Sequence, residues 1–535
     1  MKNIDRQSFT QALWTTTFVV GCSIACYRII SWFFGRLDAW GLWTIQGLPI
    51  AAFALALLLR NVKAGDVATP FRLLNGGLAV ILGTYGLLSP ISYPVGEAFV
   101  SDTMLLWFSI ASFLQLGCGV LAVFRPAFAI VPPAFVLALK EATDRLYDIH
   151  MSNTDYVALI DLSIFGFGAL ASFHLLSRQT WLPSVATLTK RYGLQNWTLT
   201  AFLTSVAIHF GNYFYSAIAK MKLDGGPFLW VQSNPTELLA YNAWSAGFLP
   251  LAHWETFSAA TLIALGTLRP VSNVLLFVGQ AVSVFCLWRR WAMIAVTLFY
   301  DLTHVAIFAV SGIFFWKWIL LNLLLVAAMR KIPVDFLRAP IILVNSAVLL
   351  ASPLIFHIVW LGWYDTPALT KSSVIAVLKD NREMAVPTNY FGSVSVVFAQ
   401  HDLGRTVPGH FPTGTWGSTK SDEILFSALT SCSLPPDGKW HLKADQEQIK
   451  RPIELIHRYA LQREKRFGDY HYDLYPHHIW SNPMLYDEFA SVLPSEIDHY
   501  LYRTESVCVS HENGFPVENP VLRDDLKVRV STNLD

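Results

Sequence analysis

The chain has 535 residues, of which 53% are hydrophobic and only 14% are charged. An ordinary soluble domain carries about 25% charged residues, so this composition excludes a water-soluble globular protein of the same size. The net charge of +1 excludes a global electrostatic attraction to nucleic acid, and the 19 Trp, 19 Tyr and 36 Phe exclude a disordered chain.

The charged residues are unevenly distributed along the chain. Residues 1–364 consist of one apolar run after another, whereas residues 365–535 have the composition of a soluble domain of usual size. We therefore predict a polytopic α-helical membrane bundle over 1–364, followed by a mixed α/β extracytoplasmic domain over 365–535.

A helix needs about 20 mostly apolar residues to cross a bilayer, and ten stretches approach that requirement. They are 11–33, 42–59, 76–95, 103–124, 156–178, 199–219, 271–287, 291–313, 314–330 and 340–361. The first stretch contains no small-residue cleavage site, so we interpret it as a membrane helix rather than a removed signal peptide. We predict about ten crossings, give or take one or two.

Two further apolar stretches are ambiguous. The stretch 126–140 contains the Pro132-Pro133 pair, and 227–267 is interrupted by prolines and titratable residues. An irregular backbone cannot face lipid, so we expect 227–267 to be re-entrant or interfacial and covered by protein.

Lysines and arginines in short loops predict the orientation, because cytoplasmic loops carry an excess of positive charge. The basic residues gather before the first predicted helix, between the second and third, near 178–191, and at 330–338, whereas the loop 96–102 has none. The N-terminus is then cytoplasmic and 365–535 is periplasmic, lumenal or extracellular. This assignment requires 126–140 to cross and 227–267 not to. We expect the membrane to be a bacterial inner (cell) membrane.

The six cysteines fall into two groups. Cys432 and Cys508 are the two in the outer domain, where an oxidising compartment would allow them to pair. The other four lie in apolar helices, where we expect small buried hydrophobic side chains. These four are Cys22, Cys26, Cys118 and Cys286.

Several predicted membrane helices contain titratable residues, which are expensive to insert. Asp301 and His304 are three residues apart and therefore share a helix face. Asp161, His174 and His357 are the other examples. For each of them the alternative to a functional role is a structural polar contact between helices.

The stretch 209–230 is the richest in polar side chains. His209, Tyr213, Ser216 and Lys220 lie at helical spacing on one face. A lysine at the end of a membrane helix commonly extends its ammonium to the interface, which is the structural interpretation. The functional interpretation is a water-lined pocket in which Lys220 serves as a base.

The run from Asn212 to Met221, Asn-Tyr-Phe-Tyr-Ser-Ala-Ile-Ala-Lys-Met, resembles the Tyr-Phe-x-Ala-Gly-x-x-Lys-Leu motif of the HTTM superfamily. This superfamily comprises the vitamin K-dependent gamma-glutamyl carboxylases and their bacterial relatives. The resemblance extends over roughly 10–330. The broader pattern is also similar: a later helix carries Asp301 and His304, the Phe314-Phe315-Trp316 run follows it, and a C-terminal extracytoplasmic domain lies beyond this range.

The resemblance implies that Lys220, with Lys222 as the fallback, is the base that deprotonates a reduced quinone. Together with the polar stretch 209–230, this leads us to place Lys220, His209, Tyr213, Asp301 and His304 in catalysis, and Asn212 and Trp230 in cofactor binding. Two departures argue against glutamate carboxylation itself. The motif glycine is Ser216 or Ala217, and Thr154 stands where the carboxylases have a functional histidine. We expect a related quinone-linked activity, either carboxylase-like or that of a quinol-dependent oxidoreductase.

In the outer domain, 373–378 and 394–398 alternate as strands do, 404–419 has the composition of a loop, and 450–465 fits a helix introduced by Pro452. The run 469–478 brings together potential metal ligands, including His471, His477 and His478, without a recognised structural zinc spacing. We favour a packed loop or partner-binding surface over a metal site there.

Three functional hypotheses follow. The first is a membrane enzyme of the HTTM type that acts on a lipid-soluble quinol or another lipidic substrate. The second is a non-enzymatic scaffold or assembly factor whose outer domain binds a partner protein or peptide. The third is a transporter, which the lack of visibly paired inverted halves disfavours.

Overall fold

The structure is a computed structural model of the chain. It describes residues 6–36, 41–96, 99–151, 155–223, 226–250, 253–362, 364–400, 403–413, 418–419, 423–434, 445–472, 478–479, 481–512 and 515–530. Thr154 and His477, which the sequence analysis singled out, lie outside these described residues.

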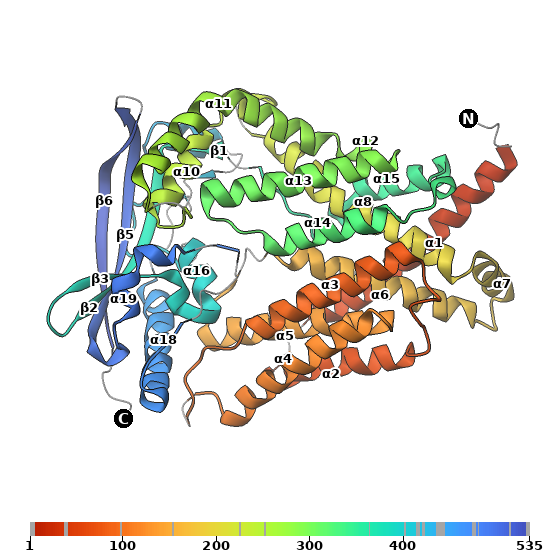
Figure 1. Ribbon diagram of the computed structural model, residues 1–535, viewed down its shortest axis with the longest axis horizontal. Helices are drawn as coiled ribbons and strands as arrows, with labels where there is room; N and C mark the ends of the chain where they lie inside the picture. Colours follow the sequence, from red (N-terminus) through yellow and green to blue (C-terminus); the bar gives the residue numbers. More distant parts are fainter. Residues whose placement is uncertain are drawn as a thin grey trace.

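Helices make up the first two thirds of the chain (Figure 1). They are α1 (Arg6–Phe34), α2 (Leu42–Leu58), α3 (Thr69–Leu88), α4 (Asp102–Ala122), the 3-10 helix η2 (Pro126–Ile130), α5 (Val131–Tyr147), α6 (Val157–Ser177), α7 (Pro183–Tyr192), α8 (Leu194–Met221), α9 (Leu229–Ser233), α10 (Thr236–Ser245), α11 (Glu255–Ala281), α12 (Ser283–Cys286), α13 (Arg290–Ser311), α14 (Trp316–Met329) and α15 (Ala339–Ile355).

Seven helices among the described residues are long and apolar enough to cross a membrane, and three shorter apolar helices accompany them. The seven are Gln7–Phe34, Thr69–Leu88, Asp102–Ala122, Pro126–Tyr147, Val157–Ser177, Ser258–Ala281 and Arg290–Ser311. The shorter ones are Ile45–Leu58, Trp316–Met329 and Ala339–Ile355. The helices fit the predicted membrane bundle, while the number of crossings stays a prediction.

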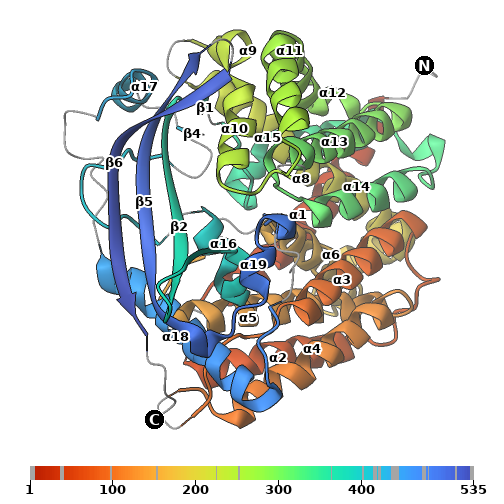
Figure 2. The ribbon, with the colours of Figure 1, turned by 60° about the vertical axis from the view of Figure 1, so that its left-hand side comes forward.

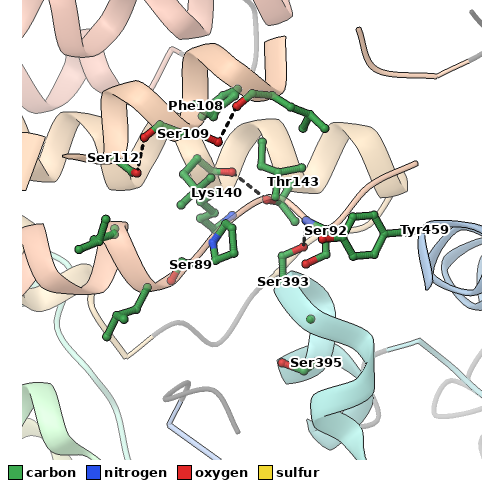
Figure 3. A pocket seen from close by; sticks show the side chains of 18 of the residues that line it. Ser89, Ser92, Phe108, Ser109, Ser112, Lys140, Thr143, Ser393, Ser395 and Tyr459 are labelled. Atoms are coloured by element: carbon green, nitrogen blue, oxygen red, sulfur yellow. Dashed lines mark hydrogen bonds between the residues drawn. The ribbon is translucent and has the colours of Figure 1, made fainter. Parts of the chain in front are cut away.

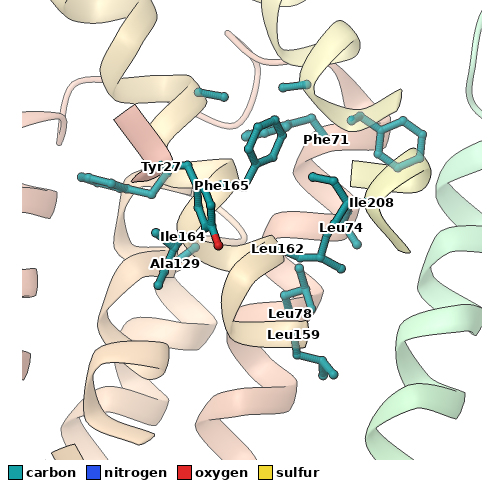
Figure 4. Packing of buried hydrophobic residues seen from close by; sticks show 14 of the residues in the cluster. Tyr27, Phe71, Leu74, Leu78, Ala129, Leu159, Leu162, Ile164, Phe165 and Ile208 are labelled. Carbon is teal, nitrogen blue, oxygen red and sulfur yellow. The ribbon is translucent and has the colours of Figure 1, made fainter. Parts of the chain in front are cut away.

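The interior of the bundle is built around α6 and α8, which are buried along most of their length. Figure 4 shows how Phe165 and Leu162 of α6 pack against Tyr27 of α1 and against Phe71 and Leu74 of α3. A helix that is apolar all round is expected to be buried, and α6 follows this rule.

Two ambiguous stretches take defined forms. Pro132 and Pro133 lie in the first turn of α5, where proline removes no helical hydrogen bond, so 126–147 is continuous helical structure. The stretch 227–267 is not one irregular segment, because it contains α9, α10 and the first half of α11. The predicted helix 271–287 was therefore misplaced: α11 begins at Glu255 and ends at Ala281.

The C-terminal part is a mixed α/β structure, as predicted. A four-stranded antiparallel sheet has the order β3-β2-β5-β6, and a small pair joins β1 to β4. The strands are β1 (Tyr364–Asp365), β2 (Ala368–Leu378), β3 (Glu383–Val386), β4 (Ser418–Thr419), β5 (Ile497–Glu512) and β6 (Phe515–Arg529). The helices include η4 (Thr388–Val394), α16 (Ser395–Gln400), α17 (Glu423–Thr430), α18 (Gln446–Phe467) and α19 (Asp487–Ala490).

Local predictions in this part had mixed outcomes. The strand at 373–378 and the helix at 450–465 are confirmed as parts of β2 and α18. The strand predicted at 394–398 is wrong, since this segment is helical. Val394, Val397 and Phe398 are buried at the three- and four-residue spacing of a helix, so helical packing outweighed the alternating pattern.

The sheet and α18 lie at one end of the bundle, and α1 begins at the other end (Figures 1 and 2). Helix α7 also lies at this other end (Figure 1). The boundary at 364/365 marks a change in composition but not a separate core. Phe108 and Phe135 of the bundle belong to the same buried cluster as Ile453 of α18 and Tyr500 of β5.

Cys432 and Cys508, whose pairing the sequence left open, form a disulfide that ties the segment after α17 to β5. Cys22, Cys26, Cys118 and Cys286 are free thiols in or beside bundle helices, and each is half-buried rather than fully buried. The expectation that they are small packed side chains is therefore met only in part.

Candidate functional site

Lys220 is buried inside the protein near the end of α8, with 1% of its surface exposed. Its Nζ atom donates to the carbonyl oxygen of Leu361 at 2.6 Å and to Gln280 Oε1 at 3.2 Å. The amine also lies 4.9 Å from the ring centre of Trp230. The structural interpretation of a lysine extending to the headgroups does not describe this geometry.

Asn212 and Ser216 lie about two turns and one turn before Lys220, respectively, and they bind the segment that leaves the last bundle helix. Asn212 Oδ1 accepts a hydrogen bond from the backbone N–H of Val359 at 2.9 Å, and Ser216 Oγ accepts one from Leu361 at 3.3 Å. Asn212 thus positions the carbonyl-bearing segment that contacts Lys220. Its contact with a cofactor stays a prediction.

A carboxylic acid is buried on the outer side of Lys220. Asp365 in β1 has 1% exposure, and its Oδ2 atom accepts a hydrogen bond from Asn234 at 2.9 Å. Burial raises the pKa of Asp365 to about 7, and the neighbouring Glu237 adds to the rise while Lys220 opposes it. This carboxyl group therefore titrates near neutral pH next to a buried amine.

His209 and Tyr213 belong to a second cluster, deeper in the bundle. His209 Nε2 lies 2.7 Å from Asn322 Oδ1, and Asn322 Nδ2 donates to the Tyr213 hydroxyl at 3.3 Å. Since the amide oxygen can only accept, this arrangement places the histidine proton on Nε2. The Tyr213 ring stacks on Tyr300 with 3.5 Å between ring centres.

Asp301 and His304 share one face of α13, as predicted, and each is 8% exposed. The His304 ring lies 6.1 Å from Tyr213 and 6.0 Å from Trp318. The structure therefore brings His304 to the His209–Tyr213 cluster.

A third cluster contains a buried ion pair that the sequence analysis did not identify. Lys317 at the start of α14 is fully buried, and its Nζ atom lies 2.9 Å from Asp155 Oδ1. His478 Nδ1 lies 3.8 Å from the same oxygen, and His478 Nε2 lies 3.0 Å from Gln400 Nε2. An acid, an amine and an imidazole thus meet where the bundle joins the outer domain.

Aromatic rings connect the second and third clusters. The Trp318 indole N–H donates to the backbone oxygen of Asp155 at 2.7 Å, and the same ring lies 5.5 Å from His209. Phe315 lies between His304 and His478, at 5.3 Å and 6.1 Å from their rings. A continuous path of polar and aromatic side chains runs from the bundle interior to the outer domain.

A cavity of about 1100 Å³ opens beside the third cluster. Asp155 and His478 form part of its wall, together with residues of α3, α4, α5, α16 and α18. Figure 3 shows polar side chains from these elements around it, including Ser109, Lys140 and Tyr459. Lys220 does not line this cavity.

The predicted site residues therefore form two groups rather than one pocket. His209, Tyr213 and His304 lie together, while Lys220, further along α8, contacts Trp230 of α9. Asp161 has a structural role, because it accepts a hydrogen bond from the backbone of His357 and lies 3.0 Å from its imidazole.

The residues that sequence reasoning missed differ in how visible they were. Lys317 is a cation within the apolar run Phe314–Trp318, and the high cost of placing it there was a usable signal. Gln280, Asn322 and Asp365 carried no such signal, because each is brought to its partner by contacts between distant segments.

No group of three or more potential metal ligands occurs among the residues that the structure describes, a set that includes His471 and His478 but not His477. Comparison with protein-family models, with curated proteins and with solved structures finds no match to the chain. The geometry of these clusters is therefore the basis for any functional assignment.

Proposed function

We propose that this protein is an integral-membrane enzyme of the HTTM type that removes a proton from a lipid-soluble quinol, with Lys220 as the base. The observation that carries the proposal is the buried amine of Lys220, which neutral acceptors hold inside the protein. A lysine in such a place is costly, and functional use is the usual reason for keeping one.

The surroundings of Lys220 suit both of its protonation states. The Leu361 carbonyl and the Gln280 amide oxygen accept hydrogen bonds from a neutral amine as well as from an ammonium. The Trp230 ring and the nearby Asp365 favour the ammonium that forms when the proton arrives. Lys220 can therefore accept a phenolic proton and later release it.

The residues near Lys220 also fit an aromatic cofactor. Trp230 offers a ring for stacking, and its Nε1–H is buried without a hydrogen-bond partner among the described residues. A quinol bound there would supply an acidic hydroxyl group, and Lys220 would take up its proton to leave the quinolate.

The test is anaerobic difference spectroscopy of a reduced naphthoquinone added to the purified protein, because quinol and quinolate absorb differently. We expect the wild-type protein to form quinolate at a lower pH than free quinol does. Lys220→Ala should abolish this shift, and Lys220→Arg should retain binding without deprotonation.

The matched control is Lys222→Ala, which removes an exposed lysine only two residues away. It should behave as the wild type does. A spectrum that is unchanged in Lys220→Ala would overturn the role of Lys220, and mass spectrometry of a quinone that copurifies with the wild type but not with this variant would support it.

The alternative of a partner-binding scaffold has one observation in its favour. The 15-residue strand β6 lies at the end of the sheet order, so one of its edges has no neighbouring strand within the described residues. An open edge can pair with a strand of another protein. Affinity purification in mild detergent should then recover a stoichiometric partner, and binding should survive Lys220→Ala.

A further inference from the structure

The 1100 Å³ cavity has an apolar side that reaches the outer surface of the bundle. Leu106 and Phe113 of α4 line it, yet 60% and 67% of their surfaces are exposed. In a membrane bundle these side chains would face lipid. Phe108 and Phe135 continue the apolar lining inward, and both are buried. The cavity therefore offers an apolar path from the bilayer into the protein.

Another part of the cavity lining carries positive charge. Arg463 and Arg466 of α18 line it, and their guanidinium carbons lie 4.2 Å and 5.2 Å from the ring centre of Phe467. One ring thus holds both cations close together. Neither arginine forms an ion pair with any residue in the described ranges.

The acidic residues of the cavity do not offset these two charges. Asp155 is already paired with Lys317, and Lys140, which also lines the cavity, is paired with Asp144. Asp102 lies in the first turn of α4, where the helix dipole favours its negative charge. The arginines therefore remain available for an anionic group.

The position of α18 indicates where the two arginines lie relative to the membrane. This helix buries Ile449, Ile453 and Ile456 at helical spacing against the protein and lies across the end of the bundle (Figures 1 and 2). Its arginines would then stand at the level of the lipid headgroups, above the apolar path along α4.

We propose that this cavity binds a lipid with an anionic, phosphate-containing headgroup that enters sideways from the bilayer along α4. Its apolar chain lies on Phe108, Phe113 and Phe135, and its phosphate lies at Arg463 and Arg466. The apolar side excludes a purely water-soluble anion as the natural occupant, and the two arginines discriminate against zwitterionic lipids.

The proposal is independent of the role of Lys220, which does not line the cavity. It concerns the cavity whose wall includes Asp155 and His478. Failure of either proposal leaves the other standing, because the two use different residues and different probes.

The test titrates purified protein in detergent with dioleoyl phosphatidylglycerol, dioleoyl phosphatidylcholine or inorganic phosphate and counts bound lipids by native mass spectrometry. We expect phosphatidylglycerol to bind at least tenfold more tightly than phosphatidylcholine, since each basic residue near a headgroup contributes about 1 kcal/mol. Arg463→Gln combined with Arg466→Gln should remove this preference.

The matched control is Lys465→Gln, which removes an exposed cation of the same helix that does not line the cavity. It should leave the preference within about twofold. Equal binding of the two lipids to the wild type, an unchanged preference in the double variant, or a full effect in the control would each overturn the proposal. Efficient competition by inorganic phosphate would show that the site takes soluble phosphate instead.

A second variant tests the apolar side without changing charge. Ser109→Trp puts a large ring at the part of α4 that lines the cavity, whereas Leu114→Trp puts one on an exposed part of α4 outside the lining. We expect lipid binding to fall at least fivefold in the first variant alone. Equal binding by the two variants would contradict entry along α4.

Discussion

At the residue scale, the buried ion pair of Lys317 and Asp155 has consequences for stability. Removing one member of a buried pair leaves the other charge without compensation, which costs about 3–5 kcal/mol. We predict that Lys317→Met lowers the thermal midpoint of the detergent-solubilised protein strongly. Adding Asp155→Asn should restore part of the loss, because the stranded charge is then gone.

The control for this prediction is Lys331→Met, which changes an exposed lysine just beyond the same helix. It should shift the midpoint little, since exposed charges contribute little to stability. If the thermal midpoint of Lys317→Met equalled that of Lys331→Met, the ion pair would not contribute to stability.

A buried histidine in the outer domain predicts acid sensitivity. His410 is 3% exposed, its Nδ1 atom lies 2.9 Å from Ser506 Oγ, and burial together with Arg405 lowers its pKa to about 4, while Asp524 opposes the fall. The unfolded chain binds a proton near pH 6.5, so stability is lost as the pH falls from about 6.5 towards 4.

We therefore expect His410→Gln to reduce the difference in thermal midpoint between pH 7.5 and pH 5. By linkage, His410 contributes on the order of 2 kcal/mol to the difference in the free energy of unfolding between these two pH values. His471→Gln is the control, because this histidine is 85% exposed. An equal pH response in both variants would argue against a role for His410.

At the element scale, helices α3 and α4 approach closely at Gly119. A Cβ atom added there would lie 2.6 Å from the backbone oxygen of Ala79, whereas one added at Gly117 would meet nothing within 4 Å. We predict that Gly119→Val destabilises the protein by about 1–3 kcal/mol and that Gly117→Val is close to neutral. Thermal melting of both variants checks this.

The disulfide predicts a second effect at this scale. Cys432 and Cys508 are 76 residues apart in the chain, and removal of such a native link typically costs about 2–5 kcal/mol. Cys432→Ser combined with Cys508→Ser should make the region around α17 sensitive to limited trypsin digestion. The bundle helices should keep their resistance, and general digestion of the whole chain would contradict a local role.

At the scale of the whole molecule, basic residues mark one end of the bundle. The α7 end carries Lys190 and Arg191 and lies opposite the sheet (Figure 1). By the positive-inside rule, we predict that α7 is cytoplasmic and that the C-terminal domain is on the outer side of the cell membrane.

Cysteine labelling in intact cells tests this orientation. A membrane-impermeant maleimide should label Asp380→Cys, an exposed outer-domain position, and should label Thr187→Cys in α7 only after the membrane is opened. Labelling of position 187 in intact cells would reverse the predicted orientation.

The extent to which the sequence predicted the fold depended on the range of the interactions. Long apolar helices such as α6, and the strand β2, follow from local hydrophobic pattern and were identified correctly. The segment 394–398 was misassigned because its buried side chains follow helical spacing, and Phe398 stacks on Phe391 of η4, a contact that the alternating pattern did not indicate.

For the candidate site too, the sequence predicted local features but not the contacts between distant segments. The sequence identified Lys220, His209, Tyr213 and His304 as costly or unusual residues in apolar helices. It could not show that Lys220 and His209 lie in separate clusters, because that depends on which partners the neighbouring helices bring.

The sequence by itself determined that the first 364 residues form an apolar helical bundle and that a polar domain follows, because composition and periodicity are properties of each segment alone. Only the tertiary structure decided that Lys317, Asp155 and His478 meet, and that a large cavity opens beside them. Contacts between residues hundreds of positions apart depend on how whole helices pack together. This packing cannot be predicted from the local sequence pattern of any one segment.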